Sequence, residues 1–232
     1  PRYSAFNLHS GCVEVFVKDR AHVQYSTVQN WSKNTYNLNT KRAIVETEGR
    51  MEWISGSMGS KATMLYPCTV LKGRGATDTH MTIAFASSGQ NIDTGAKVYH
   101  NAPDTKSSIE SKSISKDGGR GSYRGMVTVS PKAENCKLNV VCDALILDDG
   151  SQTDTYPTME VANPSARCEH EASVSKVSDD QVFYLMSRGH SEEEALAMIV
   201  NGFFEPFTRE LPMEYAVELN KLMALEMEGS IG

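Results

Sequence analysis

The sequence has 232 residues, of which 40% are hydrophobic, and a formal net charge of −6. The length suits one domain or one and a half, and the apolar fraction is sufficient for a buried core. The acidic balance argues against a nucleic-acid-binding protein, which usually carries a basic excess. No apolar run approaches the roughly 20 residues of a membrane span, so we expect no membrane partner.

The cysteines indicate a reducing compartment. There are five, an odd number, and their spacing contains no C-x-x-C pair and no disulfide framework: Cys12, Cys68, Cys136, Cys142 and Cys168. Free thiols of this kind are typical of a cytoplasmic protein. We find no signal peptide. Because the sequence starts at Pro1 and not at a methionine, we interpret it as a fragment or a processed chain.

Residues 1–177 predict strand after strand. β-branched and aliphatic residues, several alternating with polar ones, mark the segments Cys12–Val17, Val23–Thr27, Met81–Phe85, Met126–Val129 and Leu138–Leu147. Turn-forming clusters separate them at Lys72–Gly75, Ser87–Gly95 and Asp117–Gly121. This pattern fits a sandwich, a barrel or a β-solenoid, and no strict repeat decides between them.

Residues 178–232 predict three helices. Ser178–Gln181 and Ser191–Glu194 read as capping boxes, and Gly189 and Gly202 as helix stops. Apolar stripes follow the two boxes at Val182, Leu185 and Met186, and at Ala195, Met198 and Ile199.

The third helix is predicted to start near Pro212 and to end at Gly229. Its buried face should contain Tyr215, Leu219, Leu222 and Met223. Residues 178–232 contain eleven acidic and three basic side chains. This charge fits either a solvated helical surface or a docking surface for a basic partner.

One cluster of side chains is suited to metal chemistry. Cys168, Glu169, His170 and Glu171 offer a thiolate, two carboxylates and an imidazole, which are donors for iron or zinc. On an extended strand the two glutamates share one face, and the cysteine and histidine share the other. A full ligand set therefore needs a second element, for which Cys142 is a candidate. The alternative is a solvent-facing polar patch. The phosphate loop, the G-x-S-x-G elbow and the H-E-x-x-H motif are absent from the sequence.

The sequence resembles the SufB/SufD family of the SUF iron–sulfur cluster assembly system. The resemblance covers essentially the whole chain through the runs Cys168–Gly189, Ser191–Ala195, Ile199–Phe203, Glu210–Ala216 and Glu228–Gly232. The upstream runs Tyr25–Trp31, Thr40–Ala43 and Tyr123–Gly125 fit the SufB branch. The resemblance implies a mainly β protein, with a parallel β-helix core over residues 1–177 and a small C-terminal α-helical domain over residues 178–232.

The resemblance also implies site residues. Cys142 matches the cluster-assembly cysteine, and Glu169, His170 and Glu171 match the acidic-histidine motif beside it at the interface with SufD. Gln29, Trp31 and Lys41 match residues along a sulfur-transfer path inside the β-helix. Pro1 matches the proline that follows the sulfur-accepting cysteine, which would lie just upstream. We interpret Cys12, Cys68 and Cys136 as packing residues.

The helical segment resembles the part of the family that binds SufC, the ATPase subunit, with Phe183, Tyr184, Arg188, Phe203 and Phe204 as contact residues. The implied function is a non-catalytic scaffold that receives sulfur and iron, builds a transient cluster of the [4Fe-4S] type and passes it to apo iron–sulfur proteins. ATP hydrolysis would belong to SufC.

Further implied partners are SufD or a second SufB, the sulfur donor SufS with SufE or SufU, and reduced flavin in the full complex. The implied location is the cytoplasm, or the plastid stroma in a plastid-bearing organism. Two alternatives stay open: a SufD-like structural partner that nucleates no cluster, against which Cys142 argues, and a β-helix enzyme such as a polysaccharide lyase.

Overall fold

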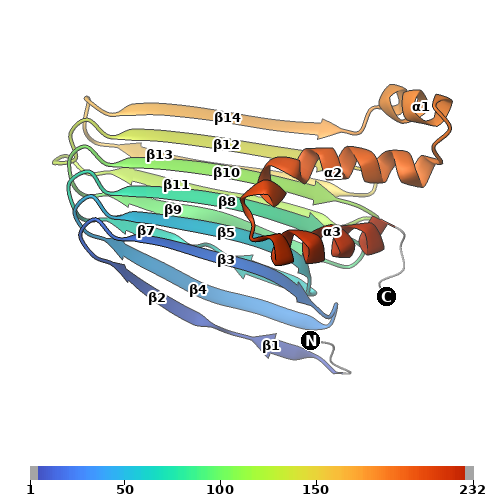
Figure 1. Cartoon of the computed structure of the whole chain (residues 1–232), viewed down its shortest axis with the longest axis horizontal. Helices are drawn as coiled ribbons and strands as arrows, with labels where there is room; N and C mark the ends of the chain where they lie inside the picture. The colour runs from blue at the N-terminus through green and yellow to red at the C-terminus, as the bar shows by residue number, and fades with distance from the viewer. Residues whose placement is uncertain (1–4, 228–232) are drawn as a thin grey trace.

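The computed structural model describes residues 5–227 and contains, in that range, fourteen strands followed by three helices (Figure 1). The strands are β1 (Asn7–His9), β2 (Cys12–Val17), β3 (His22–Trp31), β4 (Thr35–Val45), β5 (Arg50–Gly59), β6 (Ala62–Leu65), β7 (Cys68–Leu71), β8 (Thr77–Ala86), β9 (Asn91–His100), β10 (Lys106–Ser115), β11 (Arg120–Val129), β12 (Lys137–Ile146), β13 (Gln152–Val161) and β14 (Arg167–Lys176). The helices are α1 (Asp179–Ser187), α2 (Glu192–Glu210) and α3 (Met213–Met227).

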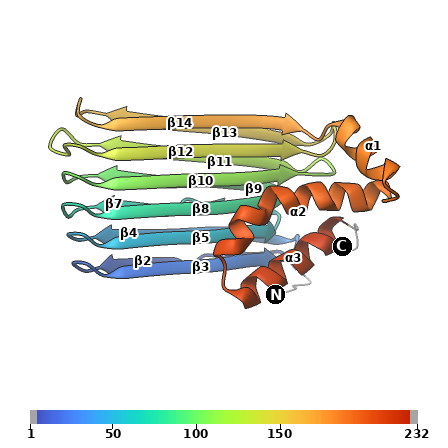
Figure 2. The ribbon, with the colours of Figure 1, turned by 45° about the horizontal axis from the view of Figure 1, so that its top comes forward.

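The strands form two parallel sheets that the chain visits in alternation. The first sheet has the order β1-β4-β6-β9-β11-β13, with β2 and β7 at its side, and the second has the order β14-β12-β10-β8-β5-β3. Each turn has one strand in the second sheet and either one long strand or two short ones in the first sheet, and successive turns stack (Figure 2). The described core is therefore a parallel β-solenoid. This confirms the fold that the family resemblance implied, which the strand pattern had left undecided.

The turns between strands stack as regularly as the strands. Glu48, Asp104 and Asn135 all have positive φ values, of 53°, 61° and 56°, and each lies just before a strand of the second sheet. The amide of Glu48 donates to the carbonyl oxygen of Arg74 at 2.9 Å, and the amide of Asp104 donates to that of Glu134 at 2.8 Å. Each turn thus satisfies backbone groups of the next one, as buried and stacked loops require.

The interior is divided lengthwise into two halves of different chemistry. Near the starts of the second-sheet strands it is bulky and mostly apolar, with Met51, Trp53 and Val140 fully or almost fully buried in one cluster, and it also contains the buried pair of Asp78 and His80. Further along the same strands, the interior residues are small. Their rows read Ser57, Ala84, Ser113 and Ala144, and Ala86 and Ser115. The apolar half is the core of the solenoid.

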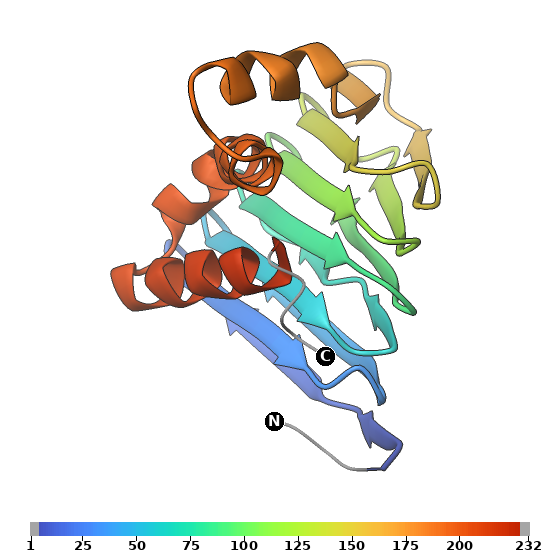
Figure 3. The same cartoon turned by 90° about the vertical axis from the view of Figure 1, so that its right-hand side faces the viewer.

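The helices cover part of the outer face of the second sheet (Figure 3). Ile83 and Phe85 of β8 point outward and are buried against Phe204, Phe207 and Leu219 of α2 and α3. A fully buried aromatic side chain contributes about 1.5–3 kcal/mol. This second apolar cluster fixes the helices on the solenoid. No helix within residues 5–227 is long and apolar enough to cross a membrane.

The structure corrects several helix predictions. Gly202 is not a stop, because α2 continues through it and through Pro206 to Glu210. The Ser191 capping box forms with both of its hydrogen bonds, whereas Ser178 makes no side-chain cap.

Three predicted positions on the apolar faces are also exposed. They are Met186 of α1, Met198 of α2 and Tyr215 of α3, while Leu219 and Met223 are buried as predicted. Gly189 does end α1, with a φ of 96°. The predicted stop at Gly229 lies outside the described residues.

One turn prediction was too long. Ser87–Gly95 combines a turn with the start of β9, which begins at Asn91. Asp93 and Gly95 lie inside that strand, and close packing explains why position 95 is a glycine. A Cβ at Gly95 would lie 1.9 Å from the carbonyl oxygen of Arg124 on the next turn.

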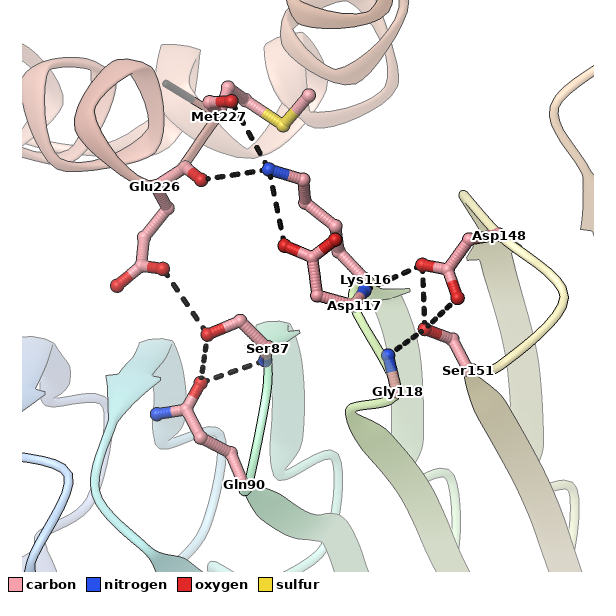
Figure 4. Close-up of polar contacts among 9 residues, drawn as sticks. All are labelled: Ser87, Gln90, Lys116, Asp117, Gly118, Asp148, Ser151, Glu226 and Met227. Atoms are coloured by element: carbon pink, nitrogen blue, oxygen red, sulfur yellow. Dashed lines mark hydrogen bonds and ion pairs between the residues drawn. The ribbon is translucent and has the colours of Figure 1, made fainter. Parts of the chain in front are cut away.

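The C-terminal end of α3 is fastened to the solenoid by polar contacts (Figure 4). Nζ of Lys116 donates to the carbonyl oxygens of Glu226 at 3.2 Å and Met227 at 3.1 Å. The hydroxyl of Ser87 donates to the Glu226 carboxylate at 3.2 Å. A lysine at the last carbonyls of a helix satisfies acceptors that have no helical partner.

We predict that Lys116→Met lowers the free energy of unfolding by about 1–3 kcal/mol, because two carbonyl oxygens lose their charged donor. The matched control is Lys72→Met, which removes an exposed ion pair with Glu46 and should change stability by less than about 0.5 kcal/mol. Urea unfolding of both variants provides the measurement. Equal losses would show that the helix end does not depend on Lys116.

Candidate functional site

Cys142 lies in the interior of the solenoid, on β12. Its side chain is 3% exposed and belongs to the apolar cluster. Burial raises the pKa of the thiol to about 12, and Asp143 acts in the same direction while the hydroxyl of Tyr123 opposes it. The thiol is therefore neutral near pH 7, and iron must displace its proton before the sulfur can act as a ligand.

Glu169, His170 and Glu171 lie on β14, the edge strand of the second sheet. Every residue of β14 is exposed, because no further turn covers this end of the described solenoid. In the register of β12 and β14, Cys142 is paired with Ala172, two positions after His170. The histidine and the cysteine therefore share the interior-facing side, and Glu169 and Glu171 point to the other side. This agrees with the alternation that the sequence predicted.

The chain alone does not assemble a complete metal site from these residues. No group of three or more histidine, cysteine or acidic side chains within residues 5–227 could hold a metal ion. In parallel-sheet geometry, His170 and Cys142 are about 8 Å apart at their Cα atoms. These two residues can supply part of a ligand set at the open end, and further ligands have to come from a partner or from the substrate.

Gln29, Trp31 and Lys41 lie together at the opposite end, on β3 and β4. Gln29 and Lys41 line one pocket of about 160 Å³. The Trp31 ring stacks on His9, another residue of that pocket, with ring centroids 4.2 Å apart. The structure thus brings together the three residues that the resemblance had assigned to one path. It adds His9, whose position on β1 gave no signal in the sequence.

Lys41 is the buried cation of this group. It is 3% exposed, and burial lowers its pKa to about 8. Nζ donates to the hydroxyl of Thr27 at 3.1 Å and lies 5.0 Å from the centre of the Tyr25 ring. Lys41 is therefore still mostly charged near pH 7, and a buried ammonium whose charge is poorly solvated is suited to binding an anion.

One interior row connects the two ends. Thr27, Ser55, Thr82, Ser111 and Cys142 are successive partners in the register of the second sheet. Their side chains point into the solenoid, and all but Thr27 are less than 9% exposed. With strands about 4.8 Å apart, the row spans about 19 Å from Thr27 to Cys142. Hydroxyl groups thus line the interior between Lys41 and the candidate assembly cysteine.

The hydroxyl row is not fully satisfied within the described part of the chain. The hydroxyls of Ser55 and of its neighbour Ser57 are buried and have no hydrogen-bond partner there. Buried polar groups are normally paired, so such groups indicate a place where water or another polar guest is held.

The other cysteines are mostly packing residues, as predicted. Cys68 and Cys136 are buried, and Cys136 is completely so. Cys12 is different, because it is exposed and lines the same pocket as Lys41. The packing interpretation of Cys12 is therefore wrong.

The residues named for partner binding fall into two groups. On α1, Phe183 and Tyr184 are 72% and 57% exposed, and Arg188 stacks on the Tyr184 ring. On α2, Phe204 is fully buried against the sheet, and Phe203 is partly buried beneath Lys112. In this structure only the α1 residues present a surface to a partner.

Sequence reasoning missed a basic groove on the outer face of the second sheet. The groove has a volume of about 470 Å³ and includes Arg50, Lys106, Lys137 and Arg167. These residues occupy one register row with Thr77, at the starts of successive strands. Their spacing of roughly 30 residues per solenoid turn is a weak repeat that could have been found once the turn length was known.

Comparison with known proteins places this geometry in a family. Residues 2–203 match the family described as "SUF system FeS cluster assembly, SufBD core domain". The chain is 59% identical, over all of its 232 residues, to an "Iron-sulfur cluster assembly SufBD family protein" of Staphylococcus saprophyticus. Proteins of the same description from Staphylococcus epidermidis and Staphylococcus haemolyticus are 59% and 58% identical over the same length.

The chain spans about half the length of these curated relatives, since 232 residues cover 50% of each. The solenoid, the match over residues 2–203 and the similarity over the full chain agree with one another. The chain belongs to the SufBD family of iron–sulfur cluster assembly proteins.

Proposed function

We propose that this chain is the SufB-type scaffold of the SUF system. It receives sulfur through the solenoid interior, builds a nascent cluster at Cys142 with His170, and passes it to apo iron–sulfur proteins. The observation that carries the proposal is the interior hydroxyl row, which leads from the Lys41–Thr27 hydrogen bond to Cys142.

The hydroxyl row suits a small anionic form of sulfur. Lys41 supplies positive charge at one end, and the hydroxyls donate hydrogen bonds along the way. The interior also shelters reactive sulfur from solvent, because Ser55, Thr82 and Ser111 are all buried. Gln29 and Trp31 lie beside Lys41, where sulfur would enter the interior.

The open end of the solenoid favours assembly at an interface. The backbone edge of β14 has no further strand beside it within residues 5–227, and His170 faces the interior at that edge. A partner of the same fold, SufD or a second SufB, can pair with such an edge and complete the ligand set. The cluster, for which we propose the [4Fe-4S] type, is cargo in this scheme.

The remaining partners follow the same proposal. SufC docks on α1 and hydrolyses ATP, SufS with SufE or SufU delivers sulfur, and reduced flavin supplies electrons in the full complex. The bacterial relatives support a cytoplasmic location. Membership of the SufBD family argues against the alternative that the chain is a polysaccharide lyase. The SufD-like alternative is favoured by one observation, the neutral and buried state of Cys142 in the chain alone.

The ligand assignment is tested by anaerobic reconstitution with iron and sulfide, in the intact protein bound to SufC and SufD. We expect wild type to develop sulfur-to-iron charge-transfer absorbance, Cys142→Ser to lose it and His170→Ala to retain only part of it, because the thiolate is the stronger iron ligand.

Cys168→Ser is the matched control, since Cys168 is exposed beside the motif and is not one of the matched positions. If Cys142→Ser gains as much cluster as wild type, the scaffold hypothesis fails, and the hypothesis of a SufD-like structural partner replaces it.

Lys41→Met should stabilise the protein at pH 7 while blocking sulfur transfer. The folded pKa of about 8 lies below the unfolded value of about 10.4, so at pH 7 the buried ammonium costs about 3 kcal/mol. Loss of the Thr27 hydrogen bond reduces the expected gain to about 2 kcal/mol.

The wild-type free energy of unfolding should rise between pH 8 and pH 10.4, where the unfolded chain binds more protons, and the advantage of Lys41→Met should vanish there. Delivery of sulfur to Cys142 in wild type should fall as the pH rises through about 8. Chemical unfolding at several pH values and labelling of Cys142 sulfur measure the two effects. A Lys41→Met variant that is less stable at pH 7 would assign Lys41 a supporting role instead.

Phe183→Ala combined with Tyr184→Ala should weaken SufC binding by more than about tenfold, because the two substitutions remove both rings of an exposed aromatic patch. Stability should change by less than about 0.5 kcal/mol, since α1 has no buried residue. Calorimetric titration with SufC measures binding, and Met213→Ala, an exposed position on α3, is the control. Unchanged affinity would remove α1 from the docking surface.

A further inference from the structure

Tyr123 is a buried polar residue beside Cys142 that the proposed assembly role has not yet used. It lies on β11, in the first sheet, is 4% exposed and belongs to the same interior cluster as Cys142. Its phenol oxygen is buried and makes no well-formed hydrogen bond within residues 5–227, although it interacts with the thiol of Cys142 and acts to lower the pKa of that thiol. A buried hydroxyl that lacks a well-formed hydrogen bond lowers stability, and a stronger acceptor at the position of the thiol would remove that cost.

The position of the ring is set by a glycine. Gly125 follows two residues later on the same interior side of β11, and a Cβ there would lie 2.9 Å from Cε1 and 3.1 Å from the hydroxyl of Tyr123. The ring therefore lies over Gly125, in space that any other residue would fill. The φ value of Gly125 is not in the left-handed region, so this glycine serves the Tyr123 ring and not the backbone.

Tyr123 and Cys142 lie in the same buried interior cluster, and the phenol interacts with the thiol, whose pKa it acts to lower. A neutral thiol is a weak hydrogen-bond acceptor. Sulfur that is bound to iron carries negative charge and is a much stronger acceptor, and charge-assisted hydrogen bonds are shorter. The phenol that has only a weak acceptor in the thiol is thus suited to anionic sulfur at this position.

We propose that Tyr123 is a sulfur-positioning residue, whose hydroxyl donates a hydrogen bond to the anionic sulfur held at Cys142 in the nascent cluster, with Gly125 providing the space for its ring. This inference rests on the proposed assembly role of Cys142. The hydrogen bond holds the sulfur on the interior side and stabilises the reduced cluster, whose sulfur atoms carry more negative charge. Hydrogen bonds to sulfur are among the factors that set the reduction potential of a cluster.

The test uses the intact protein with SufC and SufD, reconstituted anaerobically with iron and sulfide. Wild type is compared with Tyr123→Phe, Gly125→Ala and the double variant. Tyr99→Phe is the matched control, because Tyr99 lies on the outer side of β9. The readouts are the reduction potential of the cluster, its rate of loss to an iron chelator, and the thermal unfolding of each protein.

We expect Tyr123→Phe to make the reduction potential more negative and to speed cluster loss by about three- to tenfold, the effect of one hydrogen bond to a charged acceptor. Gly125→Ala should shift both readouts in the same direction, because its methyl group displaces the ring. The double variant should add little to either single change, as expected for residues that act through one contact. Tyr99→Phe should match wild type.

Failure of this inference can be distinguished from failure of the proposed function. If wild type holds a cluster and Tyr123→Phe has the same potential and the same rate of loss, the inference is wrong and the proposed function stands. If wild type holds no cluster, the proposed function fails, and the inference fails with it. A change in thermal unfolding with no shift in potential assigns Tyr123 to packing alone and also overturns the inference.

Discussion

In-register parallel stacking is the constraint on which the rest of this structure depends. Each residue of β8, β10 and β12 has a partner at the same position on the next turn, about 4.8 Å away. Residues at the same position on successive turns therefore meet in rows along the axis, and some of these rows have like chemistry without a strict sequence repeat. The Thr27–Cys142 row and the basic row from Arg50 to Arg167 are both products of this rule.

Bulky apolar residues supply most of the stability of the solenoid. Trp53, Val140 and their neighbours bury apolar area in the interior, and α2 with α3 adds a second apolar cluster on the outside. This apolar burial offsets the cost of the polar groups that the interior also contains, among them the Asp78–His80 pair, Lys41 and the unpaired hydroxyl of Ser55. Stability and the polar interior are thus supplied by different residues of the same strands.

How far the sequence predicts this arrangement depends on the range of the interaction. Strand segments such as Cys12–Val17 and the Ser191 capping box follow from local pattern, and both are confirmed. The solenoid did not follow from pattern, because many of its rows keep neither residue identity nor polarity, as in the row of Met51, Asp78, Ser107 and Leu138. It needed the family resemblance. Gly202 was misread because packing of α2 on the sheet outweighs a local stop signal. The proposed contact of Tyr123 with Cys142 joins different sheets, and no local spacing encodes it.

The incomplete state of the candidate site follows from its place at the end of the solenoid. A cluster built in the middle would be sheltered but could not be released, because β10 and β8 close the interior there. At β14 the interior is open within residues 5–227, and in the proposed scheme a partner supplies the missing wall. The buried Cys142 is neutral, which protects the thiol from oxidation, since the thiolate is the reactive form. In the proposed scheme the thiol loses its proton when iron binds to it, so the cysteine stays unreactive until a cluster is built.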